Sequence, residues 1–196
     1  RAQMGACTVG QRRVEELLNK YGRQSFESHK EALFNATRKM MEAEISNIPN
    51  GIYSGEGYVY FDGHHLGTKF TIRVTITVGD NKVTFDYSES DAQTDGFVNG
   101  TFTSSASATI LTFLQMVNPD IPHNEGMVEP IEIVIPEGKI LNANYPKATT
   151  FGNHLCPPNA DAIIRALAPV IPDRVTAGWN NLLSSLTTGV DPQTSE

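Results

Sequence analysis

The sequence contains few cysteines and no cluster of basic residues. Cys7 and Cys156 are far apart and lack Cys-x-x-Cys spacing, which excludes a disulfide framework and favours a reducing compartment. There are 15 Lys and Arg residues against 22 Asp and Glu residues, and the formal net charge is -7. Because nucleic-acid binding needs clustered cations that displace counterions, we expect no nucleic-acid partner.

Long apolar runs and the common catalytic motifs are also missing. No run approaches the roughly 20 apolar residues of a membrane span, and no segment resembles a secretory signal. The composition, 39% hydrophobic and 19% charged over 196 residues, is typical of a globular protein. We therefore expect a soluble, cytoplasmic protein that does not bind membranes. The sequence has no Walker loop, GxSxG elbow, HExxH or dinucleotide fingerprint, so its residues alone assign no ATP site and no metal site.

The first residues indicate that the chain is a piece of a longer subunit. It opens without an initiator Met, inside a helical pattern, and residues 179–196 are polar and typical of a truncated tail. An active site formed by the whole subunit is then expected to be incomplete here, and we expect this piece alone to be inactive.

Two helices are predicted over residues 1–48. Apolar residues recur at helical spacing from Val14 to Tyr21, and Gly22 stands where a C-terminal glycine belongs. A second pattern begins near Ser25, a plausible N-cap, and ends before Pro49. We expect these two helices to pair as a hairpin.

The pattern then changes to strands over residues 52–178. Apolar residues alternate with polar ones from Phe70 to Val78 and again from Val83 to Tyr87, with turn chemistry between them. Residues 58–61 form a third strand in this interpretation, and the apolar run 131–135 is a further candidate. The fold class predicted is α+β, with an antiparallel sheet and helices packed on one face.

A polar loop rich in Ser and Thr leads into a predicted helix that contains Ile110 and Phe113. The free N–H groups of such a helix start could bind an anion. Alternatively, hydroxyls such as those of Thr101 and Thr103 only cap the helix and satisfy a turn.

The histidines are the remaining candidates for chemistry. His64 and His65 lie between glycines in a predicted loop, where they are either exposed or metal ligands. His123 and Asn124, between Pro122 and Gly126, either contact substrate or another subunit or only shape their loop. His154 is expected to make a hydrogen bond at a helix entry.

Several stretches together resemble the hydantoinase B/oxoprolinase family. They include "AQMGACTVGQRRVEELLNKYG", "VTFDYSESDAQTDGFVNGTFTSSASATI", "IPHNEGMVEPIEIVIPEGKILNANYPKATTFGN" and "DAIIRALAPVIPDRVTAG". The family includes N-methylhydantoinase B subunits, the C-terminal half of 5-oxoprolinase, and the large subunits of acetone and acetophenone carboxylases. The resemblance implies that an ATP-binding, hydantoinase A-type partner phosphorylates a substrate oxygen, and that the B-type subunit completes lactam hydrolysis or ketone carboxylation.

The resemblance also implies which groups and residues take part. ATP and a divalent metal ion are implied for the whole assembly, whereas the family's metal ligands are implied to lie in an N-terminal part not matched here. The run "NGTFTSSASATILTFLQMVNPDIPHNEGM" inclines the interpretation toward the carboxylase branch. The competing hypothesis is a structural module that holds subunits together without catalytic residues. Candidates for a substrate or interface loop are the matching positions Asn99, Thr101, Thr103, His123, Asn124, Gly126 and Gly152.

Overall fold

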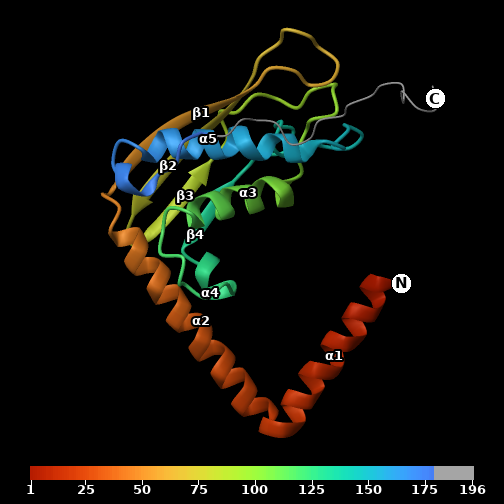
Figure 1. Ribbon diagram of the computed structural model, residues 1–196, viewed down its shortest axis with the longest axis vertical. Coiled ribbons are helices and arrows are strands. Elements are labelled where there is room, and N and C mark those ends of the chain that lie inside the picture. The colour runs from red at the N-terminus through yellow and green to blue at the C-terminus, as the bar shows by residue number, and fades with distance from the viewer. Residues whose placement is uncertain (179–196) are drawn as a thin grey trace, which may run out of the picture.

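The computed structural model describes residues 1–178, and the tail predicted for 179–196 lies outside the described residues. Two N-terminal helices, α1 (Ala2–Tyr21) and α2 (Arg23–Ser46), form the arms of a V (Figure 1). They meet at Gly22, whose φ of 78° is a left-handed conformation that glycine adopts without strain. The predicted C-terminal glycine is confirmed, but α2 starts at Arg23 and Ser25 is not its N-cap.

The two arms diverge instead of packing along their length. No residue of α1 is buried, whereas Thr37, Met41 and Ile45 of α2 are buried against the rest of the molecule. The predicted pair of N-terminal helices is therefore present, but α1 contributes nothing to the core.

The centre of the molecule is a four-stranded sheet in the order β1-β2-β3-β4. β1 (Gly51–Val59), β2 (Phe70–Gly79) and β3 (Lys82–Asp86) are antiparallel neighbours, as their alternation predicts. β4 (Ile131–Val134) pairs with β3 in parallel, so the sheet is mixed. The α+β class is confirmed, and the parallel fourth strand is an addition to the antiparallel sheet that we predicted.

Helices cover one face of this sheet. α5 (Cys156–Leu167) lies across β1 and β2, and α3 (Phe102–Leu114) packs beside α5 (Figure 1). The close approach of α5 depends on glycine, because a Cβ at Gly57 would lie 1.7 Å from the carbonyl oxygen of Pro158. The core formed between this face and the helices includes the fully buried side chains Met41, Ile45, Ile72, Ile76, Phe85, Tyr87, Phe113 and Ile163.

The other face of the sheet is polar. The Arg73 guanidinium donates to Glu56 on β1 and to Asp91 beyond β3, at 2.9 and 3.0 Å. The alternation in β2 therefore separates an apolar face under the helices from a charged face, as predicted.

Short helices complete the described part of the chain. α4 (Glu125–Val128) precedes β4, η1 (Gly152–Leu155) leads directly into α5, and η2 (Pro172–Arg174) follows it. None of the helices within residues 1–178 is long and apolar enough to cross a membrane.

Candidate functional site

Three loops meet at one end of the sheet. They are residues 60–69, 88–101 and 142–155, and we call this region the loop end (Figure 1). Backbone hydrogen bonds join them in series: Phe97 N–H donates to Asp62 O, and Phe151 N–H donates to Phe97 O, both at 3.0 Å. Because loops on a rigid sheet are common carriers of binding residues, this end is the candidate site.

Asp62 fixes the first of these loops. Its side chain is fully buried, and one oxygen accepts from the backbone N–H groups of His64 and His65 at 2.9 and 2.7 Å. The other oxygen accepts from Thr94 Oγ1 at 2.7 Å and lies 2.8 Å from His65 Nδ1. Burial by itself raises the pKa of Asp62, but the hydrogen bonds from His65, Thr94 and His64 outweigh it and hold that pKa well below its usual range.

Asn99, one of the candidates from the sequence, holds the second and third loops together. It is completely buried, and its Oδ1 accepts from Thr94 N–H at 2.7 Å. Its Nδ2 lies within hydrogen-bond distance of three carbonyl oxygens, those of Thr94, Gly96 and Ala148, at 3.0 to 3.1 Å. The amide of Asn99 is therefore hydrogen-bonded inside the protein, where it holds these loops together.

Gly152 lies directly beside Asn99. A Cβ at Gly152 would come within 2.7 Å of the carbonyl oxygen of Asn99, so the two backbones touch. The structure brings these two candidates together, and Thr101 follows two residues after Asn99.

The start of α3 is closed by its own residues. Thr101 is the N-cap, and its hydroxyl accepts from Ser104 N–H at 3.3 Å. Thr103, in the first turn, is exposed to solvent. The capping interpretation of this Ser/Thr cluster is the one that these contacts support.

The remaining candidates lie elsewhere, against α2. Asn124 is the N-cap of α4, with Gly126 N–H donating to its Oδ1, and its Nδ2 donates to Thr37 Oγ1 at 2.9 Å. A Cβ at Gly126 would stand 2.0 Å from the carbonyl oxygen of Phe34. The proline-bounded loop thus docks on α2, while His123 is exposed beside it.

The loop end contains a small aromatic hollow of about 230 Å³, which we call the aromatic hollow. Tyr58 and Tyr60 line it, with ring centroids 6.2 Å apart, and His154 comes from η1. The backbone N–H of His154 makes the expected helix-entry hydrogen bond, to the carbonyl oxygen of Phe151 at 2.9 Å, whereas within residues 1–178 its ring nitrogens have no hydrogen-bond partner. The full lining is Tyr58, Val59, Tyr60, Phe61, Val98, His154 and Pro158.

Sequence reasoning missed Asp62 and the aromatic hollow. Asp62 precedes Gly63, and an Asp followed by glycine often accepts hydrogen bonds from the next backbone N–H groups in a turn, a signal that was present in the sequence. A strand was predicted over residues 58–61, but β1 ends at Val59, so Tyr58 lies in the strand while Tyr60 and Phe61 follow it. His64 and His65 are exposed loop residues, as one of the two interpretations held.

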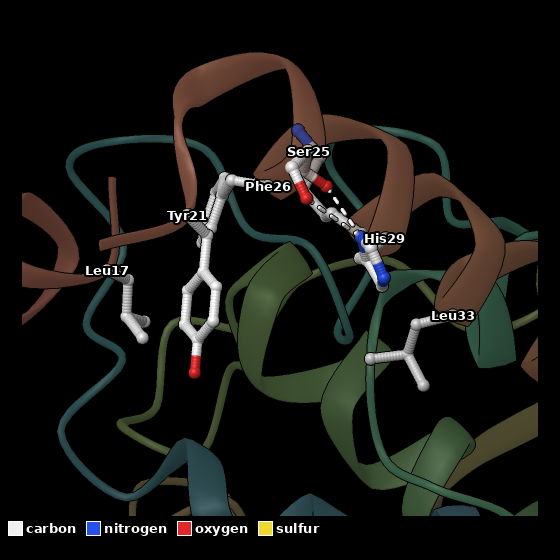
Figure 2. A pocket seen from close by; sticks show the side chains of 7 residues that line it. Leu17, Tyr21, Ser25, Phe26, His29 and Leu33 are labelled. Carbon is white, nitrogen blue, oxygen red and sulfur yellow. Dashed lines mark hydrogen bonds between the residues drawn. The ribbon is translucent and has the colours of Figure 1, made fainter. Parts of the chain in front are cut away.

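A second hollow of about 460 Å³ lies in the V between α1 and α2. Figure 2 shows Leu17 and Tyr21 of the first arm near Phe26, His29 and Leu33 of the second. His29 Nδ1 lies 2.7 Å from the carbonyl oxygen of Ser25 and 3.5 Å from the Ser25 hydroxyl. Few polar groups converge here, so this surface is a weaker candidate for chemistry than the loop end.

The described residues do not suit ATP or a metal ion. The start of α3 is occupied by its own Thr101 cap, and the sequence has no glycine-rich phosphate loop. In residues 1–178, no group of three or more His, Cys, Asp or Glu side chains is arranged to hold a metal ion.

The fold and the loop end define an α+β domain with a one-sided sheet whose cross-linked loops carry the candidate site. Comparison with known proteins then gives the family. The chain belongs to the hydantoinase B/oxoprolinase family, whose model matches residues 1–196.

Individual relatives agree with this assignment. A Pseudomonas protein described as the B-type subunit of a D-/L-hydantoinase is 33% identical over 191 residues, which cover 92% of this chain and 32% of that protein. The crystal structure of ATP-dependent caprolactamase from Pseudomonas jessenii matches with a TM-score of 0.81 and 30% identity, covering 91% of this chain and 31% of that one. A nucleotide-free acetone carboxylase matches with a TM-score of 0.73 at 20% identity, over 86% of this chain and 24% of that one, which shows the shared fold. The chain spans about a third of the length of the first two relatives.

Proposed function

We propose that this chain is part of the B-type subunit of an ATP-dependent enzyme that hydrolyses a cyclic amide of the hydantoin, oxoproline or lactam kind. The observation that carries the proposal is the match to ATP-dependent caprolactamase, at 30% identity and a TM-score of 0.81 over 91% of the chain. The hydantoinase relative at 33% identity supports the same substrate class. Ketone carboxylation is the alternative reaction, and its supporting relative has only 20% identity. The similarities thus favour the hydrolases, whereas the run "NGTFTSSASATILTFLQMVNPDIPHNEGM" had favoured the carboxylase branch.

The chemistry divides naturally between two subunits. A lactam oxygen is a poor leaving group until it becomes a phosphate ester, so an ATP-binding, A-type partner is needed to activate it. In this proposal the partner binds ATP and transfers the phosphoryl group, with the divalent metal ion bound outside residues 1–178. The loop end of this chain holds the organic ring while water adds to the activated carbon, the ring C–N bond breaks to give the amine, and a second water releases the phosphate to leave the carboxylate. The unpaired Cys7 and Cys156 fit a cytoplasmic assembly.

A second candidate function is a structural module without reacting groups, and one observation favours it. The side chains of Asn99, Asn124 and Thr101 form hydrogen bonds with loop and helix-cap backbone groups inside the protein. In that case the chain would shape the assembly and contact neither substrate nor intermediate.

The test is ATP turnover by the full-length subunit co-expressed with its A-type partner. Lactams or hydantoins are expected to stimulate ATP hydrolysis and to give the ring-opened product, whereas a ketone with bicarbonate is expected to do neither. Stimulation by the ketone alone would replace hydrolysis by carboxylation, and stimulation by none of these compounds would contradict the proposal.

Alanine variants separate the site from the scaffold. Asn99→Ala and Asn124→Ala are measured for turnover and for urea stability, with Thr77→Ala, at an exposed position of β2, as the control. Because both asparagines hold backbone, a loss of turnover counts toward a site only if the variant's fold stability is retained. If both variants stay folded and turn over normally, these two residues belong to the scaffold.

A further inference from the structure

The aromatic hollow combines a small volume with a polar ring, that of His154, which has no hydrogen-bond partner among residues 1–178. At about 230 Å³ it is smaller than the roughly 300–1,000 Å³ of pockets that hold drug-sized ligands. An occupant of this size is a single ring of a few atoms. A peptide or a nucleotide would be too large.

His154 supplies the polar group of this hollow. It is partly buried, its ring meets Phe151 edge-on with centroids 5.3 Å apart, and Phe151 in turn contacts Phe97 at 5.2 Å. These contacts hold the imidazole in place while its nitrogens have no hydrogen-bond partner among residues 1–178. A partly buried polar group without a protein partner is a ready site for a hydrogen bond from a ligand.

Charge around the hollow selects the kind of ring. Lys69 Nζ lies 4.4 Å from the centre of the Tyr58 ring, and the Arg165 guanidinium lies 5.5 Å from it. These cations hold the ring of Tyr58 in place. The residues that line the aromatic hollow include no Lys, Arg, Asp or Glu, so nothing in that lining offsets the charge of an ionised ligand. The Tyr58 hydroxyl donates to Glu56 at 2.8 Å, so its hydrogen is used within the protein and Tyr58 contributes ring carbons to the hollow.

We propose that the aromatic hollow binds a small, uncharged cyclic amide, with the ring of the ligand against Tyr58 and Tyr60 and one polar atom of its amide bonded to His154. A flat amide can lie against these aromatic rings, and it offers both a donor and an acceptor to imidazole. The choice of an amide rests on the proposed function. The size and lining of the hollow by themselves favour only a compact neutral ring with a polar atom.

Histidine NMR of the whole chain tests the proposal. The chain has five histidines, so labelling their Cε1 atoms gives few signals, and the His154 signal is assigned by its loss in His154→Gln. The probe is 2-piperidone. A saturable shift of the His154 signal is expected with 2-piperidone, and none with piperidine, the cationic ring of the same size.

Variants then locate the binding. His154→Gln and Tyr60→Ala are expected to weaken 2-piperidone binding about tenfold, the equivalent of one lost hydrogen bond or ring contact. Binding to His154→Gln is followed by the chemical shift of the ligand. Tyr60→Phe keeps the ring and is expected to bind normally. His123→Gln and Tyr21→Ala, an exposed histidine and an exposed tyrosine elsewhere, are the matched controls and are expected to change nothing.

The outcomes test the proposed binding site and the proposed function independently of each other. No saturable shift at His154, or equal binding by Tyr60→Ala, overturns the proposed site even if lactam-stimulated ATP turnover is observed. Saturable binding that depends on Tyr60 and His154 supports the site even if the co-expressed subunits show no turnover, which would overturn only the proposed function. The unchanged signals of the other histidines show that each variant is folded.

Discussion

Burying a carboxylate is costly unless its oxygens are fully hydrogen-bonded, and Asp62 meets this condition with four contacts. We expect Asp62→Asn to lower the free energy of unfolding by about 2–3 kcal/mol, because an amide NH₂ would face donors and leave buried groups unpaired. The measurement is urea unfolding at neutral pH. Asp95→Asn is the control, since Asp95 is exposed and pairs with Lys147 at the surface, and its effect is expected to be below about 1 kcal/mol. Equal effects of the two changes would contradict the role assigned to Asp62.

The same carboxylate predicts how stability depends on pH. The pKa of Asp62 is lowered in the folded protein, so its contribution to stability is present above the ordinary carboxyl pKa of about 3.9 and is lost as the pH falls below that value. We expect the difference in unfolding free energy between the native chain and Asp62→Asn to stay level from about pH 6 to about pH 5 and to shrink as the pH falls from about 4.5 to 3. A difference that stays constant over this range would show that Asp62 acts by shape alone.

Among single residues, some positions of the candidate site could be predicted from the sequence and others could not. The stretch from Asn99 to Thr101 could be placed at a loop before a helix, because Ser and Thr ahead of an apolar helical pattern form a recognisable cap. The partners of Asn99 could not be predicted, since Ala148 is far away in sequence and is brought near by the fold. His154 was expected to bond at a helix entry, but its environment depends on rings from three separate segments.

At the scale of elements, alternation predicted β2 and β3 almost to the residue, because one of their faces is buried and the other is charged. β1 was placed too late because Gly55 and Gly57 stand where apolar residues would have marked its buried face. The parallel pairing of β4 with β3 is a contact between segments some fifty residues apart, which local periodicity does not encode.

The glycines of β1 also carry an element-scale prediction. In Gly57→Ala the added methyl group would meet the carbonyl oxygen of Pro158 at 1.7 Å, so α5 has to move away from the sheet. We expect a loss of at least about 2 kcal/mol of unfolding free energy, measured by urea unfolding. Gly79→Ala in the same sheet is the matched control, because nothing lies within 4 Å of its added Cβ. If Gly57→Ala is as stable as this control, α5 does not pack on β1 as the structure has it.

At the scale of the whole molecule, α1 is a twenty-residue helix without a single buried residue. Helical propensity alone gives an isolated helix of this length only marginal stability in water. We therefore expect the backbone amides of α1 to exchange hydrogen quickly, and those of β2, at the centre of the core, to exchange slowly. Hydrogen exchange followed by mass spectrometry measures both. Protection of α1 comparable to that of β2 would mean that the arm is packed against another surface in solution.

The proposed division of the reaction between two subunits gives the last prediction. The chain has no glycine-rich phosphate loop, and residues 1–178 gather no set of metal ligands, so the phosphoryl donor, the metal ion and the ring cannot all be positioned on one surface of this chain. We expect the purified 196-residue chain to show no turnover with ATP, a divalent metal ion, and candidate lactams or ketones, even if it binds a lactam in the aromatic hollow. The matched assay contains the full-length subunit with its A-type partner, where turnover is expected. Product formed above background by the chain alone would show that the reacting groups lie within these residues after all, and would move the active site onto the loop end itself.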